Sequence, residues 1–186
     1  MGNSSIRIEH GNYKGIKISD GFSSPGSRIT TSANRCVLFN VLRNKLYIDF
    51  NNLICADFCC GSGIVGFEML SLGAKKCFFL DCDKKKLHDI YVAINKAKFT
   101  AETICAYLPQ CCFTTQRFNV IFFDPPYANN FINQTINMIA EHELLSAQGL
   151  LIVETTQNID TSNYNILDVK ILKNKAKFYF LQKKNM

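Results

Sequence analysis

With 186 residues, 47% of them hydrophobic and 19% charged, the chain is long enough for one domain with a substantial core. No apolar run is long enough to cross a bilayer, and the N-terminus lacks the apolar core of a signal peptide, so we expect a cytoplasmic protein. The nine cysteines include no Cys-x-x-Cys pair, which argues against a metal site and fits a reducing compartment.

The net charge of +6 is distributed unevenly along the chain. Residues 1–45 carry seven Lys or Arg and two acidic residues, and residues 46–169 carry eight and thirteen. Residues 170–186 carry six Lys and no acidic residue. Two basic ends around an acidic middle favour contact between the ends and a polyanion such as RNA. The alternative is that these Lys-rich ends are simply solvated.

The first predicted element in chain order is a β-hairpin. Residues 5–19, "SIRIEHGNYKGIKIS", alternate in character on either side of Gly11-Asn12, a dipeptide typical of a hairpin turn. A loop follows. Apolar residues then recur at helical spacing from Thr31 to Leu46, which predicts a helix with Ser32 as its N-cap.

From residue 52 onward, short apolar runs alternate with segments of helical pattern. Predicted strands cover residues 52–58, 76–81, 102–106, 118–124 and 149–155, and predicted helices lie within residues 61–74, 84–99 and 131–145. This alternation predicts an α/β fold in which helices cover both faces of a mostly parallel sheet. Two closing strands, residues 164–172 and 176–184, are expected to form an antiparallel pair at its edge. Residues 107–118 have no clear assignment.

A glycine turn between the first predicted strand and its helix points to a cofactor site. It reads Gly61-x-Gly63-x-x-Gly66, and Asp81 lies at the tip of the next strand. Glycines let the backbone approach a nucleotide, and a carboxylate at the second strand accepts hydrogen bonds from ribose hydroxyls. The alternative is a tight turn that needs glycine only for its backbone angles.

The type of cofactor is indicated by Asp57 and by the segment after the fourth strand. Asp57 ends the first strand, where a carboxylate suits the cationic amino-acid end of S-adenosyl-L-methionine. A dinucleotide site would favour an apolar approach to its pyrophosphate. No acid or base for hydride transfer is evident either, so an NAD-dependent oxidoreductase is the less favoured interpretation.

The segment Asp124-Pro125-Pro126-Tyr127 predicts the chemistry of the site. An exocyclic amine is a poor nucleophile, and the Asp124 carboxylate with the Pro125 carbonyl could accept its two hydrogens. The carboxylate would also stabilise the positive charge that reaches the nitrogen during methyl transfer. The prolines fix the turn, and the Tyr127 ring offers a surface on which a flipped base can stack. Since ligands bind at the carboxyl ends of parallel strands, Asp57, Asp81 and Asp124 should line one rim.

Six segments carry a resemblance to a known family. They are, in order along residues 6–182, "IRIEHGNYKGIKI", "SPGSRITTSANRCVLFNVL", "DFCCGSGIVGFEMLSLGA", "FLDCD", "FFDPPY" and "LLIVET". Through them the sequence resembles the bacterial small-subunit ribosomal RNA guanine-N2 methyltransferases, those that modify guanine 966 of 16S rRNA. Single motifs are shared with DNA adenine methylases, but the ordered set with its N-terminal segment is more specific.

The resemblance implies a Rossmann-like class I methyltransferase fold and S-adenosyl-L-methionine as the cofactor. It implies that residues 1–30 form an N-terminal hairpin extension and residues 31–186 form the methyltransferase domain. The implied reaction is methylation of the exocyclic N2 amine of a guanine in 16S rRNA, either naked or within an assembling particle. We expect a cytoplasmic monomer with no obligate protein partner.

The resemblance also implies roles for residues outside the glycine turn. Arg28, Thr30 and Arg35 belong to the segment that resembles the family's arginine-threonine motif, and they are expected to contact RNA or the closed cofactor site. Cys105 stands where many methyltransferases carry Asp or Asn to bind the cofactor's adenine amine. We therefore expect the backbone at Ala106 to supply that contact.

The sequence departs from the family pattern at three more positions. Ile29 stands where the family usually has proline, Ser32 where it often has aspartate, and Asp81 where glutamate is more usual. Asp81 would reach the same ribose with a shorter side chain.

Two other functions stay open from the sequence. An adenine-N6 methyltransferase of DNA or RNA shares the Asp-Pro-Pro-Tyr motif, although 186 residues leave no room for an inserted target-recognition domain. A catalytically silent RNA-binding scaffold would need none of Asp57, Asp81 and Asp124, and all three are present.

Overall fold

The structure is a computed structural model that describes residues 5–19, 30–110, 116–126 and 130–184. Its strands are β1 (Ser5–Arg7), β2 (Lys17–Ser19), β3 (Ile54–Phe58), β4 (Lys76–Asp81), β5 (Ala101–Cys105), β6 (Phe118–Phe123), β7 (Leu145–Thr155), β8 (Tyr164–Ile171) and β9 (Lys177–Lys183). Its helices are α1 (Ser32–Asn40), a π-helical turn η1 (Val41–Lys45), α2 (Ile64–Ser71), α3 (Lys84–Ala97) and α4 (Phe131–Glu141).

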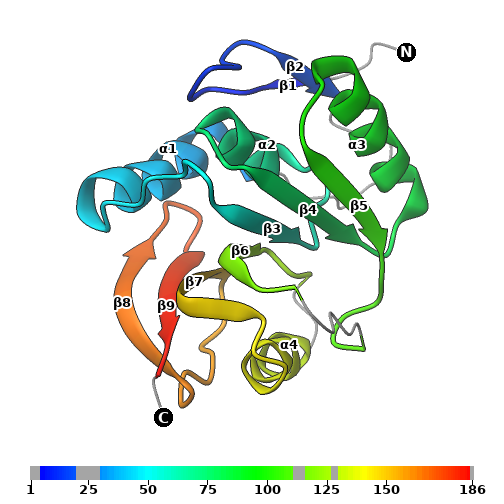
Figure 1. Cartoon of the computed structure of the whole chain (residues 1–186). Coiled ribbons are helices and arrows are strands. Elements are labelled where there is room, and N and C mark those ends of the chain that lie inside the picture. The colour runs from blue at the N-terminus through cyan, green and yellow to red at the C-terminus, as the bar shows by residue number, and fades with distance from the viewer. Residues whose placement is uncertain (1–4, 20–29, 111–115, 127–129, 185–186) are drawn as a thin grey trace.

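Seven of these strands form one sheet in the order β5-β4-β3-β6-β7-β9-β8 (Figure 1). The first five strands in that order run parallel, whereas β9 is antiparallel to both β7 and β8. The predicted α/β class with a mostly parallel sheet and an antiparallel edge is therefore confirmed. Because parallel strands end at the same edge, β3, β4 and β6 bring their carboxyl ends together.

Helices cover both faces of the sheet, as expected for parallel strands that are buried on both sides. On one face, Phe79 and Phe122 belong to a buried cluster that includes residues of the hairpin, α1, α2 and α3. On the other face, Phe78 and Phe123 pack in a second cluster with α4. Figure 1 shows α4 on the opposite side of the sheet from α1 and α2.

Two predicted helix boundaries are wrong. Thr31, not Ser32, caps α1, because the Thr31 hydroxyl accepts a hydrogen bond from the Asn34 amide at 3.2 Å. The predicted helix over residues 131–145 ends at Glu141, since Glu143 adopts a left-handed backbone conformation (φ 51°) and β7 begins at Leu145.

The N-terminal hairpin is confirmed as an antiparallel β1–β2 pair, separate from the main sheet. Its turn lies against the end of α2, where Asn12 donates a backbone hydrogen bond to the Ser71 carbonyl at 2.8 Å. Gly11 (φ 75°) packs so closely on Ser71 that a Cβ would overlap its carbonyl group. Ile8 and Ile18 are buried in the cluster under α1 and α2, so the hairpin shares the main core. The division of the chain at residue 30 stays a prediction.

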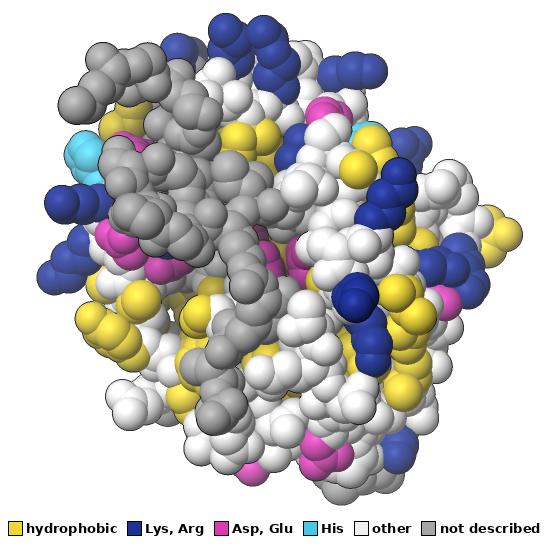
Figure 2. All heavy atoms as spheres, turned by 180° about the vertical axis from the view of Figure 1, so that it is seen from behind, with side chains coloured by type: hydrophobic (Ala, Val, Ile, Leu, Met, Phe, Trp, Pro, Cys, Tyr) yellow, Lys and Arg dark blue, Asp and Glu magenta, His cyan; other side chains and the backbone are white. Residues whose placement is uncertain are grey.

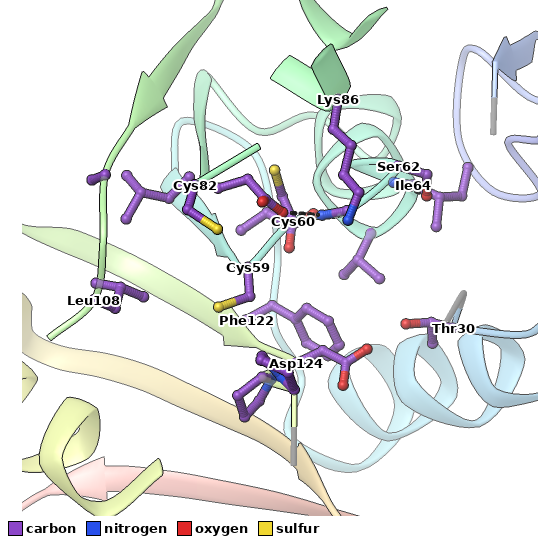
Figure 3. Close-up of a pocket in the computed structure, with 18 of the residues that line it drawn as sticks. Thr30, Cys59, Cys60, Ser62, Ile64, Cys82, Lys86, Leu108, Phe122 and Asp124 are labelled. Atoms are coloured by element: carbon purple, nitrogen blue, oxygen red, sulfur yellow. Dashed lines mark hydrogen bonds between the residues drawn. The ribbon is translucent and has the colours of Figure 1, made fainter. Parts of the chain in front are cut away.

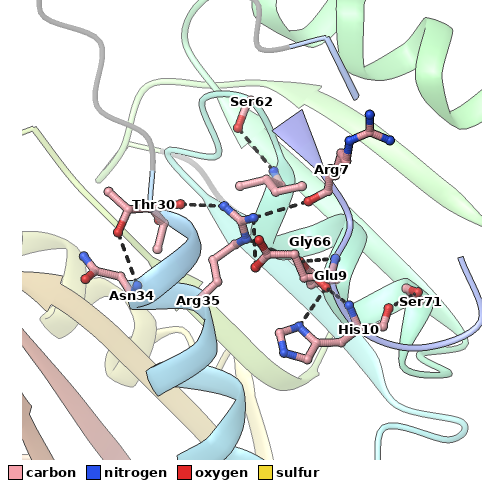
Figure 4. Close-up of polar contacts among 12 residues, drawn as sticks. Arg7, Glu9, His10, Thr30, Asn34, Arg35, Ser62, Gly66 and Ser71 are labelled. Carbon is pink, nitrogen blue, oxygen red and sulfur yellow. Dashed lines mark hydrogen bonds and ion pairs between the residues drawn. The ribbon is translucent and has the colours of Figure 1, made fainter. Parts of the chain in front are cut away.

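A buried ion pair fixes this hairpin to α1 and α2. Glu68 of α2 is fully buried and accepts hydrogen bonds from the Glu9 and His10 amides of the hairpin, each at 2.9 Å. Arg35 of α1 lies 3.3 Å from Glu68 and 3.1 Å from Glu9, and it donates to the Thr30 carbonyl at 2.8 Å (Figure 4). One guanidinium therefore holds three segments that are distant in the sequence.

We expect Arg35→Met to lower the free energy of unfolding by about 3 kcal/mol or more, because it leaves the Glu68 carboxylate buried without its guanidinium partner. Urea unfolding at neutral pH measures this. The matched control is Lys76→Met at the Lys76–Glu102 pair, whose side chains are 29% and 55% exposed. Losing that surface pair should cost about 1 kcal/mol or less. Equal costs for the two variants would contradict the role assigned to Arg35.

Candidate active site

A pocket of about 560 Å3 opens at the carboxyl ends of β3, β4 and β6 (Figure 3). Its lining combines carboxylates, backbone of the glycine turn and apolar side chains. The residues that line it are Thr30, Asp57, Cys59, Cys60, Gly61, Ser62, Ile64, Val65, Leu80, Asp81, Cys82, Lys86, Ala106, Tyr107, Leu108, Phe122, Asp124, Pro125, Pro126 and Phe131.

The glycine turn has its predicted place between β3 and α2. Gly61 and Gly63 both have positive φ values, 54° and 72°, and Gly63 forms the N-cap of α2. Gly66 has a different role, because a Cβ there would overlap the Phe79 ring on β4. The turn residues thus provide backbone conformation, while Gly66 lets α2 pack closely on the sheet.

Asp81, at the end of β4, binds the backbone of the glycine turn through its carboxylate. Its Oδ2 accepts a hydrogen bond from the Gly61 amide at 2.9 Å, and its Oδ1 accepts one from the Asp83 amide at 3.0 Å. Each carboxylate oxygen can accept more than one hydrogen bond. Asp81 lines the pocket, so a ligand with adjacent hydroxyl groups could bind to it without breaking the turn.

Asp57 is more deeply placed and is 2% exposed. Burial raises the pKa of its carboxyl well above the ordinary value, the hydrogen bond from the Gly66 amide (2.9 Å) opposes that rise, and the charge of Asp81 adds to it. Asp57 therefore lines the pocket and also binds the backbone near the start of α2.

Asp124 and the two prolines after it form another part of the pocket wall. Asp124 follows β6, donates a backbone hydrogen bond to the Phe58 carbonyl at 3.4 Å, and lines the pocket with Pro125 and Pro126. Burial raises the pKa of the nearby Cys59 thiol, and the charges of Asp81, Asp124 and Asp57 add to the rise. The structure thus brings the three predicted aspartates to one rim. Tyr127 lies outside the described residues.

Ala106 lines the pocket, but its backbone amide already donates a hydrogen bond within the protein. That N–H donates to the Asp81 carbonyl at 3.1 Å, which extends the pairing of β4 with β5. An adenine amine would have to donate its hydrogen bond to the Ala106 carbonyl, since an amine donor needs an acceptor. The exposed Cys105 thiol is directed at the Cys82 carbonyl, 3.8 Å away.

The three residues predicted to contact RNA or the closed cofactor site lie in different surroundings. Thr30 lines the pocket, and its hydroxyl donates to Glu154 at 3.3 Å. Arg35 is 2% exposed and paired with Glu68 and Glu9, so its described contacts are within the protein. Its contact with RNA or with the closed cofactor site stays a prediction. Arg28 lies outside the described residues.

Three polar residues near the pocket were missed by the sequence reasoning. Lys86, on the first turn of α3, lines the pocket, Glu154 binds Thr30, and Glu68 anchors the hairpin. Glu154 had a usable signal, because it is the next-to-last residue of a predicted parallel strand and so lies at the ligand-binding edge. Glu68 had none beyond its charge inside an otherwise apolar helix.

Within the described residues, no group of three or more His, Cys, Asp or Glu side chains is arranged to hold a metal ion. The helices in this same part of the chain are also too short or too polar to span a membrane.

Comparisons with known proteins agree with this geometry. The sequence profile of the family described as Conserved hypothetical protein 95 matches residues 6–181. A Haemophilus influenzae protein named Ribosomal RNA small subunit methyltransferase D is 31% identical over 89% of this chain and 88% of its own length. The Escherichia coli K12 protein of the same name is 28% identical over 83% of this chain and 76% of its own length. These matches confirm the predicted resemblance.

Solved structures show the same fold. A candidate methyltransferase from Escherichia coli superimposes with a TM-score of 0.81 at 24% identity, covering 98% of this chain and all of that one. A candidate methylase from Haemophilus influenzae has a TM-score of 0.76 at 27% identity with the same coverage. The predicted Rossmann-like methyltransferase fold is confirmed.

The raised pKa of Asp57 predicts a pH-dependent stability. A carboxyl whose pKa is higher in the folded than in the unfolded chain stabilises the fold only at low pH, and this contribution is lost as the pH rises through the folded pKa. Asp57→Asn removes that loss, so its free energy of unfolding relative to wild type should rise steadily above a pH of about 4 until the folded pKa is reached. Urea unfolding across pH measures it. A constant difference from pH 4 to 8 would contradict the raised pKa.

Proposed function

The chain belongs to the family described as Conserved hypothetical protein 95, and we propose that it is an S-adenosylmethionine-dependent methyltransferase acting on small-subunit ribosomal RNA. The specific target in this proposal is the exocyclic N2 amine of a guanine. The observation that carries it is the position of Asp124 and Pro125 on the wall of the pocket that also holds the glycine turn and Asp81. The name shared by the relatives supports the RNA substrate.

The described residues fit the proposed cofactor. Asp81 would accept hydrogen bonds from the ribose hydroxyls, the glycine turn would lie against the amino-acid part, and Asp57 would add negative charge near its cationic groups. A volume of about 560 Å3 lies within the range of small-molecule and cofactor pockets. When bound, S-adenosylmethionine supplies an electrophilic methyl group on a positively charged sulfur.

Asp124 and Pro125 would then act on the nucleophile. The target amine donates its two hydrogens to the Asp124 carboxylate and the Pro125 carbonyl, which orients its lone pair toward the methyl group. Positive charge would grow on the nitrogen as the new C–N bond forms, while the bond between the methyl carbon and the sulfur breaks and the sulfur leaves as an uncharged thioether. A carboxylate fixed beside that nitrogen stabilises this charge in the transition state, and no water has to reorganise. The nitrogen would become neutral again when one of its protons passes to the Asp124 carboxylate that holds it.

The charge distribution supports an RNA partner. The last seventeen residues carry six Lys and no acidic residue, so they would attract phosphates. Figure 2 shows Lys and Arg side chains mainly along the edges of one face, and Asp and Glu side chains both near its centre and at its edges. Positive charge around a recessed acidic site can hold a polyanion while the cationic part of the cofactor binds inside. In this proposal the enzyme is a cytoplasmic monomer, and Tyr127 stacks on the target base.

Asp81→Ala should weaken S-adenosylmethionine binding by roughly 1.5–3 kcal/mol, because charge-assisted hydrogen bonds to the ribose are lost. Isothermal titration calorimetry measures this, and thermal melting checks the fold. Asp83→Ala is the control, since Asp83 caps α3 nearby and does not line the pocket. If the two variants bind the cofactor as tightly as wild type, the ribose assignment is wrong.

Asp124→Ala should lower kcat by on the order of 10²–10³-fold, since it removes a preorganised acceptor and its negative charge. Asp124→Asn keeps an acceptor oxygen and should retain more activity, while cofactor affinity changes little in both variants. The assay uses small-subunit rRNA or particles from cells that lack the protein, with mass spectrometry to locate the methyl group. Near wild-type turnover by a folded Asp124→Ala variant would refute the role of Asp124. Methylation of an adenine amine would instead favour the adenine-N6 alternative.

A further inference from the structure

Thr30 lies on the pocket wall at the same end as Asp124. Thr30 precedes α1 and Asp124 follows β6, and both line the pocket. Figure 3 shows Thr30 and Asp124 on the same side of the pocket, with the Thr30 oxygen on the side of Thr30 nearer Asp124, whereas Lys86 and Cys82 lie toward the other end. A base whose amine is held by Asp124 would therefore place its neighbouring atoms near Thr30.

The side chain of Thr30 is held by Glu154, a buried residue of β7. Phe123 of β6 pairs with Val153 of β7, so Asp124 and Glu154 are the next residues along these two strands. Glu154 is 5% exposed, and its Oε2 accepts a hydrogen bond from the Thr30 hydroxyl at 3.3 Å. Its Oε1 accepts another from the Asn34 amide group at 3.4 Å.

The backbone of Thr30 is fixed as well. Its carbonyl accepts a hydrogen bond from Arg35 at 2.8 Å, and Arg35 is itself paired with Glu68. Figure 4 shows Thr30, Arg35 and Asn34 together at the start of α1. Thr30 is therefore held at its main chain and at its hydroxyl by two different buried groups.

The hydrogen bond to Glu154 determines whether the Thr30 hydroxyl can donate or accept a hydrogen bond with a ligand. A hydroxyl has one proton and two lone pairs. Because the Thr30 proton is directed at a carboxylate oxygen, the lone pairs are what remain for the pocket. Thr30 thus presents a hydrogen-bond acceptor next to the acceptor groups of Asp124.

This polarity distinguishes between purines. In guanine, the N2 amine lies beside N1–H, which is a donor. In adenine, the N6 amine lies beside an unprotonated N1, which is an acceptor. A flipped base is read through hydrogen bonds to this edge. An acceptor at Thr30 would pair with guanine N1–H and would face the lone pair of adenine N1.

We propose that Thr30, oriented by Glu154, accepts a hydrogen bond from N1–H of the target guanine and so selects guanine over adenine. Glu154 is a positioning residue that acts through Thr30. This inference rests on the proposed guanine-N2 methylation. It assigns the selection of the base to Thr30 and Glu154, whereas Asp124 and Pro125 hold the amine.

The test compares guanine with 2-aminopurine at the mapped target site of a synthetic RNA, naked or assembled into whichever particle the wild-type enzyme methylates. 2-Aminopurine keeps the N2 amine but lacks N1–H. Wild type should prefer guanine by about 10- to 100-fold in kcat/KM, the usual range for one base-reading contact. Thr30→Val should reduce this preference to within about 3-fold and leave the calorimetric cofactor Kd within about 2-fold, while Thr30→Ser should keep it.

Glu154→Gln provides a second, independent variant. The amide of glutamine can donate to the Thr30 oxygen, which frees the hydroxyl proton to point into the pocket, so the guanine preference should fall as in Thr30→Val. Asn34→Ala is the matched control, because it removes a hydrogen bond from the same carboxylate without touching Thr30, and the preference should remain.

Three results would overturn the inference. The first is an unchanged guanine preference in Thr30→Val or in folded Glu154→Gln. The second is a tenfold or greater loss of cofactor affinity in Thr30→Val with the preference intact, which would assign the hydroxyl to the cofactor. The third is a wild-type product methylated on adenine N6, which would also refute the proposed function. Formation of N2-methylguanine with no effect of Thr30→Val would refute only the role of Thr30.

Discussion

The buried carboxylate of Glu68 is the constraint on which one wall of the candidate site depends. A carboxylate without water is costly unless its oxygens are paired and hydrogen-bonded. Here the partners come from outside α2: two hairpin amides, the His10 ring and the Arg35 guanidinium. If the hairpin separated from α2, the Glu68 carboxylate would either become exposed to solvent or stay buried without its hydrogen-bond partners. Because Arg35 also binds the Thr30 carbonyl, the same interaction places the residue that enters α1 against the pocket.

At the carboxyl edge of the sheet, three more carboxylates converge, and two of them are tied to backbone amides of the glycine turn and α2. Asp81 accepts from Gly61, and Asp57 accepts from Gly66. These bonds offset part of the cost of gathering negative charge, and they hold the turn in a shape that a ligand does not have to create. Burial and mutual repulsion still raise the pKa of Asp57, so the pocket favours a ligand that brings positive charge. The sulfonium and ammonium groups of the proposed cofactor have that property.

Much of the fold and part of the site could be predicted because their signals are local. Continuous apolar runs indicate parallel strands, and the spacing of Gly61, Gly63 and Asp81 needs only one strand–turn–helix unit and the next strand. Arg35 could not be placed in the same way, because its main partner Glu68 is 33 positions away and its burial depends on how the hairpin closes. The end of α4 was missed for a related reason: the helical pattern continues past Glu141, and pairing of β6 with Leu145 prevails over it.

A short chain of contacts links the glycine turn, where the cofactor is proposed to bind, to Thr30, where the base is proposed to bind. The helix that begins at the glycine turn carries Glu68, Glu68 binds Arg35, and Arg35 holds the main chain of Thr30. If the cofactor and the RNA base occupy the two ends of this chain of contacts as proposed, a shift of α2 on cofactor binding would move the wall that faces the base. Linkage requires that the base then affect cofactor affinity by the same factor. The paired Glu68 carboxylate would hold Thr30 in place before either ligand binds, which favours preorganisation over closure around the substrate.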